Sequence, residues 1–163
     1  MNLDKIINSR HSIRSYQKRD VEYNLIGEIL ESAKNAPSSG NIQNWRFIII
    51  KEKEKKEKIA QCCLNQLWIA EAPVCIAICY DKKEIERKFP KDYEEYSVQN
   101  VAIIATYIML KAVELSLGTC WIAISQSSIV AKLLNLPENV IPSVILTLGY
   151  PKDSHKKTAR YPL

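Results

Sequence analysis

Residues 93–117 constrain the fold more than any other segment, because they form one long and mostly apolar helical stretch. The apolar side chains cover most of the predicted circumference, and they include Val98, Val101, Ile104, Ile108, Leu110 and Leu115. A helix that is apolar all round is a buried helix. We therefore expect it to be covered by its own domain on one side and by a partner subunit on the other. Gly118 is expected to end it in the cap position.

Shorter apolar patterns complete an α+β layout. Apolar residues at three- and four-residue steps predict helices, and short apolar runs predict buried strands. The other expected helices cover residues 3–8, 21–35, 53–67 and 128–134, and the expected strands cover 46–51, 74–80, 120–124 and 143–148. With 163 residues and 47% hydrophobic content, the chain is expected to form one domain over residues 1–163.

The composition argues against several classes of protein. Much of the net charge of +5 comes from residues 51–58, where Lys and Glu alternate as on a solvated helix face. Nucleic-acid binding needs unopposed bases with aromatic residues among them, so it is not expected, whereas anionic small molecules are. The longest apolar run, residues 101–110, is too short to span a bilayer, and residues 1–8 lack a signal-peptide pattern. We expect a cytoplasmic protein without membrane contact.

The cysteines predict reduced and buried thiols. The chain has five cysteines, an odd number. Cys75 and Cys79 lie in an expected buried strand, where a spacing of four places both on one face. Because no Cys-x-x-Cys pair or neighbouring His accompanies them, neither a disulfide framework nor a metal site is expected.

The sequence Arg-His-Ser-Ile-Arg at residues 10–14 predicts a phosphate-binding element. In an extended backbone, Arg10, Ser12 and Arg14 lie on one face. Two guanidinium groups flanking a hydroxyl suit a phosphate, because Arg presents a planar fork of donors that matches phosphate oxygens in pairs. A solvated basic strand is the alternative interpretation.

Residues 36–47 form a second polar element between an expected helix and an expected strand. Pro37 disfavours helix at the preceding residue, and the short polar residues after it can bond to their own backbone or to a ligand. Asn41, Gln43 and Trp45 together offer amide hydrogen bonds beside an aromatic wall. An ordinary capped turn is the alternative.

These elements and three later ones occur in an order and spacing that resembles the FMN-dependent nitroreductases over nearly the whole chain. The motifs are Arg-x-Ser-x-Arg at 10–14, Pro-Ser-Ser-Gly-Asn-x-Gln-x-Trp at 37–45, Gly-Thr-Cys-Trp-Ile at 118–122, Leu-Gly-Tyr-Pro at 148–151 and Arg-Tyr-Pro-Leu at 160–163. The resemblance implies a three-layer sandwich, with a central mixed, mostly antiparallel sheet between helices. It also implies that the long helix lies at the interface of a homodimer.

The resemblance implies that FMN binds at this interface and that each subunit contributes to both sites. Its phosphate and neighbouring flavin oxygens would be contacted by Arg10, His11, Ser12 and Arg14, with Arg160 closing on the same phosphate. The ring would lie along Trp121, Ile122 and Ala123, whose backbone amides would be near its redox-active nitrogen. Asn65 would face the pyrimidine edge.

The flavin of the other subunit would be reached from the second polar element. The residues implied are Pro37, Ser38, Ser39 and Asn41, with Gln43 supporting their loop. This chain departs from the family at Trp68, where some members carry a Lys near the flavin; a cation there would stabilise the reduced, anionic flavin. Unless Arg14 substitutes for that Lys, a lower flavin potential is expected. The chain is also shorter than the larger members, which predicts a more open site.

The implied activity is a ping-pong oxidoreductase. NADH or NADPH would reduce FMN and leave, and an electron-poor acceptor such as a nitroaromatic or a quinone would then bind. No catalytic side chain is expected, and Cys120 is interpreted as a small core residue. Since no Gly-x-Gly-x-x-Gly element is present, the dinucleotide would bind transiently, and ferredoxin or flavodoxin is an alternative donor. The motifs also leave open a flavin storage or sensor protein, a flavin-consuming or dehalogenating relative, and a structural module without flavin.

Overall fold

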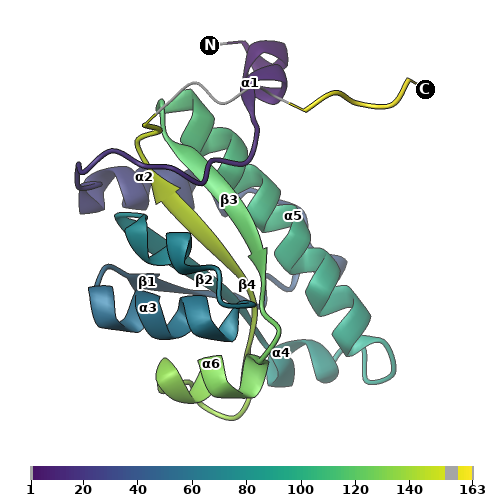
Figure 1. Ribbon diagram of the computed structural model, residues 1–163. Coiled ribbons are helices and arrows are strands. Elements are labelled where there is room, and N and C mark those ends of the chain that lie inside the picture. Colours follow the sequence, from purple (N-terminus) through teal and green to yellow (C-terminus); the bar gives the residue numbers. More distant parts are fainter. Residues whose placement is uncertain (1, 153–157, 163) are drawn as a thin grey trace.

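The computed structural model describes residues 2–152 and 158–162. Its centre is a four-stranded sheet in the order β1-β2-β4-β3 (Figure 1). The strands are β1 (Trp45–Ile50), β2 (Val74–Asp81), β3 (Gly118–Ala123) and β4 (Val140–Gly149). All pairs within this sheet are antiparallel. The family resemblance implied a mixed, mostly antiparallel sheet. Among the described residues, the parallel pairing is a bridge outside the named strands, which joins Ser12 to Thr119.

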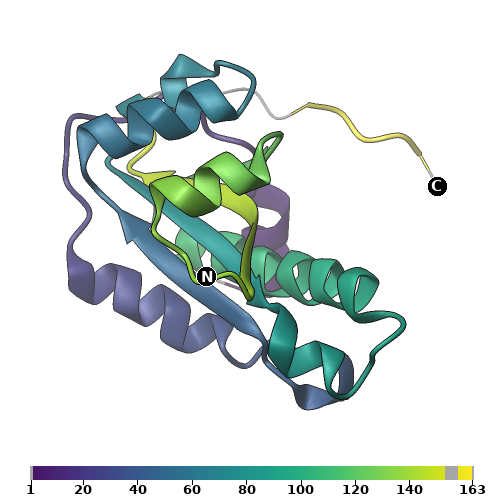
Figure 2. The same ribbon diagram turned by 90° about the horizontal axis from the view of Figure 1, so that it is seen from below.

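Helices cover both faces of the sheet, which confirms the predicted α+β sandwich (Figures 1 and 2). One face packs against α2 (Tyr23–Ala33) and α5 (Tyr93–Glu114), and the other against α3 (Lys53–Cys62) and α6 (Ser127–Leu133). The helix α1 (Leu3–Ser9) lies beside α5. The short helix α4 (Lys82–Glu86), which the sequence patterns did not predict, begins where the Asp81 side chain accepts a hydrogen bond from the Lys83 amide.

Alternation along β2 divides the interior into two cores. Val74, Ile76 and Ile78 belong to the core under α2 and α5. Cys75, Ala77 and Cys79 belong to the core under α3, because successive side chains of a strand point to opposite faces. The expected placement of Cys75 and Cys79 on one face is confirmed, and all of the cysteines are buried and free.

The long helix ends earlier than expected, and Gly118 does not cap it. The helix α5 ends at Glu114, Ser116 adopts a left-handed φ of 61°, and Gly118 is already the first residue of β3. A β-carbon on Gly118 would lie 2.5 Å from Cγ1 of Ile13. The glycine is required by this close approach of the N-terminal segment rather than by the helix end.

The helix expected over residues 53–67 is also interrupted. It ends at Cys62, and the backbone turns through left-handed conformations at Leu64 and Asn65 into a short 3-10 helix, η2 (Leu67–Glu71). Lys56 fixes η2 to α3, because its buried Nζ donates a hydrogen bond to the carbonyl oxygen of Ala72 at 2.5 Å. This break places the residues around Trp68 beside the N-terminal segment.

One side of α5 is left uncovered within the chain. A groove of about 420 Å³ between α1 and α5 is lined mainly by apolar residues, which include Leu3, Ile6, Ile7, Tyr107 and Leu110. Leu3 and Tyr107 are 63% and 41% exposed. By length and composition α5 also meets the criterion for a membrane span, although it packs against α2 and the sheet as a core helix does.

Candidate functional site

The N-terminal segment after α1 is fastened to the open edge of the sheet. The amide of Ile13 donates a hydrogen bond to the carbonyl oxygen of Thr119 at 2.9 Å. The hydroxyl of Tyr16 lies 2.6 Å from the carbonyl oxygen of Ile13 and 2.6 Å from Oγ1 of Thr147. Burial raises the pKa of Tyr16, so it remains a neutral hydroxyl that ties the segment to β4.

The predicted phosphate-binding segment runs beside the start of β3. Ser12 forms a parallel bridge with Thr119, and the amide of the next residue, Ile13, donates to the carbonyl oxygen of the same threonine. Arg10 is the cap residue that follows α1, and Arg14 lies over the Trp68 ring. Burial raises the pKa of the Cys120 thiol in β3, while Arg14, a hydrogen bond with Ser12, and Arg10 lower it.

Beyond this point β3 is an edge strand of the sheet, and the carbonyl oxygen of Trp121 accepts a hydrogen bond from Sγ of Cys120. The carbonyl of Thr119 faces outward to Ile13, and in an antiparallel strand the backbone groups of every second residue point the same way. The N–H and C=O groups of Trp121 and Ala123 therefore face the open edge. Trp121 is 40% exposed, whereas the Ile122 side chain is buried in the core. The backbone groups of Ile122 face β4, so the predicted contact of its amide with the ring is not available at this edge.

Two buried polar atoms flank this edge without a partner among the described residues. They are Nε2 of His11 and Oγ1 of Thr119. The Nδ1 atom of His11 lies 2.8 Å from the carbonyl oxygen of Ser9, so in a neutral ring Nδ1 donates and Nε2 accepts. Because buried polar groups are rarely left unpaired, both atoms favour a ligand or a second chain at this edge.

The residues around η2 lie on the same side of the molecule as the N-terminal segment. Trp68 faces Arg14 and packs against the cluster that contains Ile13 and Tyr16. Asn65 is exposed in a left-handed conformation, three positions before Trp68. The backbone turn between α3 and η2 thus sets the direction of the Asn65 side chain.

Asn100 of α5 holds the loop of residues 37–43. The Oδ1 atom of Asn100 accepts hydrogen bonds from the Ser39 amide at 2.8 Å and from its hydroxyl at 3.1 Å. Nε2 of Gln43 donates to the backbone and side-chain oxygens of Asn41, which confirms that Gln43 supports the loop. Gly40, Asn41 and Gln43 all have left-handed φ angles, and Ser38 Oγ accepts a hydrogen bond from the Gln43 amide. Pro37 is exposed at the start of the loop.

Sequence reasoning missed the buried residues that anchor this loop. Asn44, Ser97 and Asn100 are fully buried. Nδ2 of Asn100 donates to Oδ1 of Asn44 at 3.0 Å, and Nδ2 of Asn44 donates to the Ser97 hydroxyl at 3.1 Å. The sequence carried one signal for them, because Ser97 and Asn100 are polar residues three positions apart within an otherwise mostly apolar helix.

The two halves of the predicted site lie beside well-separated parts of α5. Ser39 is bonded to residue 100, whereas His11 shares a groove of about 160 Å³ with Val113 and Leu117. Residues 100 and 113 are about 20 Å apart along a helix that rises ~1.5 Å per residue. Within one chain, the loop and the N-terminal segment therefore do not form one site.

Arg160 does not join either half. It is exposed in the C-terminal segment, which extends away from the sheet in both views (Figures 1 and 2). Its Nη1 donates a hydrogen bond to Oγ1 of Thr158 at 3.3 Å. The expected closing contact with the phosphate is thus not made within the chain.

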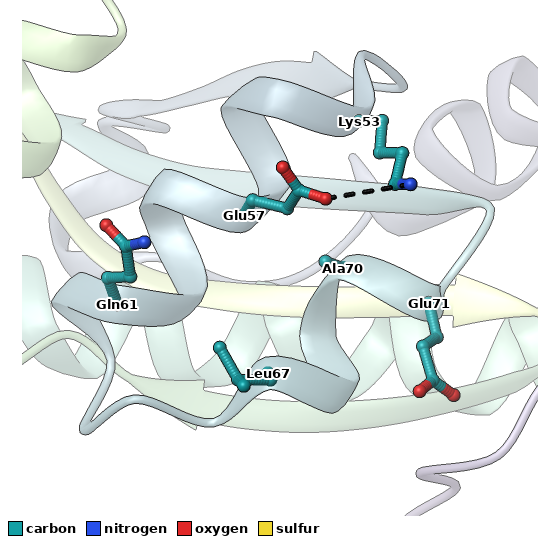
Figure 3. Close-up of a pocket in the computed structure, with 6 residues that line it drawn as sticks. All are labelled: Lys53, Glu57, Gln61, Leu67, Ala70 and Glu71. Carbon is teal, nitrogen blue, oxygen red and sulfur yellow. Dashed lines mark ion pairs between the residues drawn. The ribbon is translucent and has the colours of Figure 1, made fainter.

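A separate groove of about 390 Å³ lies on the outer side of η2, against α3 (Figure 3). Its charged residues are Lys53, Glu57 and Glu71, and Lys53 pairs with Glu57 across 3.8 Å.

In residues 2–152 and 158–162, no group of three His, Cys, Asp or Glu side chains is placed to hold a metal ion.

Comparisons with known proteins agree with this arrangement. The Nitroreductase family matches residues 7–71 and 61–150. A protein of Methanothermobacter thermautotrophicus is provisionally named an NADH dehydrogenase or NAD(P)H nitroreductase. It is 33% identical to this chain over 94% of this chain and 80% of its own length. The solved structure of NfrA2 from B. megaterium has a TM-score of 0.90 at 30% identity, over 99% of this chain and 72% of that one. An FMN-dependent nitroreductase from Clostridium difficile has a TM-score of 0.83 at 28% identity, over 96% and 92% of the two chains.

Proposed function

Because this chain belongs to the nitroreductase family, we propose that it is an oxidoreductase that binds FMN between two copies of itself. NADH or NADPH would supply the electrons, and a nitroaromatic, a quinone or a similar electron-poor molecule would accept them. The open edge of β3 beside Arg10 and Arg14 is the observation that carries the proposal.

The residues at this edge fit FMN chemically. Arg10 and Arg14 can pair with the phosphate oxygens, and Ser12, which lies between them in the sequence, is paired with Thr119 of β3. The outward N–H groups of Trp121 and Ala123 are donors for the ring, and the exposed Trp121 indole offers it an apolar wall. A ligand at this edge would also approach the unpaired atoms of His11 and Thr119.

The separation along α5 supports a homodimer as the functional unit. The loop of residues 37–43 is too far away to complete the site of its own chain, since Ser39 is anchored to Asn100, about 20 Å along the helix from the groove that contains His11. The apolar groove between α1 and α5 offers a surface that a second copy would cover. In such a pair, Ser38, Ser39 and Asn41 of one copy would reach the FMN of the other.

The chemistry of the proposed reaction belongs to the cofactor, which transfers hydride or electrons when it is bound. The protein would bind the phosphate, orient the ring against β3 and leave one face open to donors and acceptors in turn. Proton transfer by a side chain is not required. Cys120 is buried and its thiol has a raised pKa, so it supports the strand as a small core residue rather than as a nucleophile.

The proposal also includes a single domain and a cytoplasmic location. The two core clusters share the single sheet, which supports one domain over residues 1–163. A cytoplasmic location follows from the proposed use of a reduced nicotinamide donor and is favoured by buried free thiols.

The absorption spectrum of the purified protein, followed by anaerobic addition of NADH or NADPH, tests the function. We expect a flavin spectrum that is bleached by a nicotinamide donor and restored by a nitroaromatic or a quinone. Bound flavin that no donor bleaches would favour a storage or sensor role. Colourless protein that does not take up added FMN would contradict the proposal.

A further inference from the structure

A basic pocket lies between the connection from α4 to α5 and the loop of residues 37–43. It has a volume of about 480 Å³ and is lined by Ile42, Glu84, Arg87 and Lys88. Nζ of Lys88 donates a hydrogen bond to the carbonyl oxygen of Gly40 at 2.8 Å, which fixes this wall to the loop. Ile42 directly follows Asn41, so the pocket borders the part of the loop that is proposed to reach a flavin.

Glu84, the acidic residue that lines this pocket, is already paired with another base. Its Oε1 accepts a hydrogen bond from Nη2 of Arg46 at 2.5 Å. The same Nη2 lies 3.3 Å from Oδ2 of Asp81. The carboxylate of Glu84 is thus held by Arg46 rather than by Arg87 or Lys88, the two bases that line the pocket.

Arg87 is left as a cation without an acidic partner. It is exposed, and no ion pair in the described part of the chain involves its guanidinium. Lys88 uses one of its three N–H donors on the carbonyl oxygen of Gly40, and its Nζ also lies 5.8 Å from the centroid of the Phe89 ring. A guanidinium fork beside an ammonium group that has donors to spare suits a dianionic phosphate.

We propose that Arg87 and Lys88 bind the 2′-phosphate of the nicotinamide donor, so that NADPH is the preferred reductant. This inference rests on the proposed function. NADPH and NADH differ only in that phosphate, and a dinucleotide that stacks its nicotinamide on a flavin must lay its adenosine end across the neighbouring surface. The pocket borders Asn41 of the loop that is proposed to reach the flavin, and Ile42 would give the adenosine end an apolar wall.

Binding of 2′,5′-ADP, which is the phosphorylated adenosine end of NADPH, tests the site without any redox step. We would measure it by calorimetry on the FMN-loaded protein, on Arg87→Ala and on Lys83→Ala. Lys83 is an exposed base on α4, the helix that ends just before Arg87, and it does not line the pocket. We expect Arg87→Ala to weaken binding about 10- to 100-fold, as for the loss of charge-assisted hydrogen bonds, and Lys83→Ala to leave it unchanged. Equal binding by Arg87→Ala and the parent protein, or parent protein that binds 5′-AMP as tightly as 2′,5′-ADP, would overturn the proposal.

The kinetic counterpart compares the two donors. Arg87→Ala should lower kcat/KM for NADPH by a similar factor, mainly through KM, and leave kcat/KM for NADH within about twofold. Equal losses with both donors would count against a 2′-phosphate contact. If 2′,5′-ADP binding depends on Arg87 but neither nucleotide bleaches the flavin, the proposed function fails and the site stands. Normal bleaching with binding that is independent of Arg87 would reject the site alone.

Discussion

The guanidinium carbon of Arg14 lies 5.9 Å from the centroid of the Trp68 ring. This distance is within the range of a cation–π contact, which holds the Arg14 charge next to η2. Trp68 is partly buried against Ile13 and Tyr16, so its ring is a fixed platform. Trp68 stands where the family resemblance predicts a Lys in some members. It positions the Arg14 cation there instead of supplying a cation itself.

Trp68→Lys should raise the midpoint potential of bound FMN. The new ammonium would add a positive charge where reduced flavin is anionic, and a shift on the order of 30 mV corresponds to about 1.4 kcal/mol for a two-electron couple. Trp68→Phe keeps an aromatic platform for Arg14 and should leave the potential close to that of the parent. Anaerobic dye titration measures both, and equal potentials in all three proteins would rule out an electrostatic role for this position.

Replacing Arg10 and Arg14 together by Ala should release FMN. Each charge-assisted contact with a phosphate contributes about 1.5–3 kcal/mol, so the double variant should purify without colour. Arg19→Ala is the matched control, because Arg19 stacks on Tyr150 at 3.8 Å rather than facing Cys120. The ratio of flavin to protein absorbance reports the outcome, and a yellow double variant would refute the phosphate assignment.

Asn100→Ala should weaken both the fold and the loop that it anchors. The substitution leaves the Ser39 amide and Oδ1 of Asn44 without their partner, and each unsatisfied buried group costs about 1–3 kcal/mol. Urea denaturation should show this loss, and FMN should bind more weakly because the loop reaches the second copy's site. Gln99→Ala changes an exposed neighbour on α5 and should stay within about 0.5 kcal/mol of the parent. An Asn100→Ala protein with unchanged FMN affinity would separate the loop from the cofactor site.

Tyr107→Asp should break the proposed dimer. Tyr107 lines the apolar groove between α1 and α5, and a buried carboxylate without a partner is costly. We expect sedimentation to show a dimer for the parent protein and a monomer that has lost FMN for the variant. Ile129→Asp places the same charge at a similarly exposed apolar position on α6, across the sheet, and should remain dimeric. A parent protein that sediments as a monomer with FMN bound would remove the basis for a shared site.

Alkaline pH should destabilise the fold through its buried thiols. Burial raises the pKa of Cys79 from its ordinary value of 9.0 to about 12, and that of Cys75 is also raised to about 12. The unfolded chain therefore loses these protons first, so the stabilising effect is complete below pH 9 and declines as the pH rises toward 12. Each thiol contributes a loss of up to about 1.4 kcal/mol per pH unit in that window. Urea denaturation under reducing conditions between pH 8 and 10.5 should show a shallower decline for Cys79→Ala than for the parent, and parallel slopes would contradict this assignment.

The sequence by itself determined the features that depend on local periodicity. Alternation along β2 assigns Ile76 and Cys75 to opposite cores, and alternation over residues 10–14 places both arginines on one face. These results follow because the side-chain direction of a strand repeats every two residues, whatever the rest of the chain does. The family resemblance rested on motifs of the same local kind.

The tertiary structure alone decided which distant residues meet. Trp68 meets Arg14 because the chain turns out of α3 at Leu64 and Asn65, and Gly118 is needed because Ile13 crosses it. The Asn44–Ser97–Asn100 network is likewise formed between a loop and a helix that are far apart in sequence. Side-chain periodicity carries no information on such pairs, since their geometry is set by packing across the sheet. The same packing places Ser39 and His11 about 20 Å apart along α5, and this is the physical reason for expecting a second copy to complete the site.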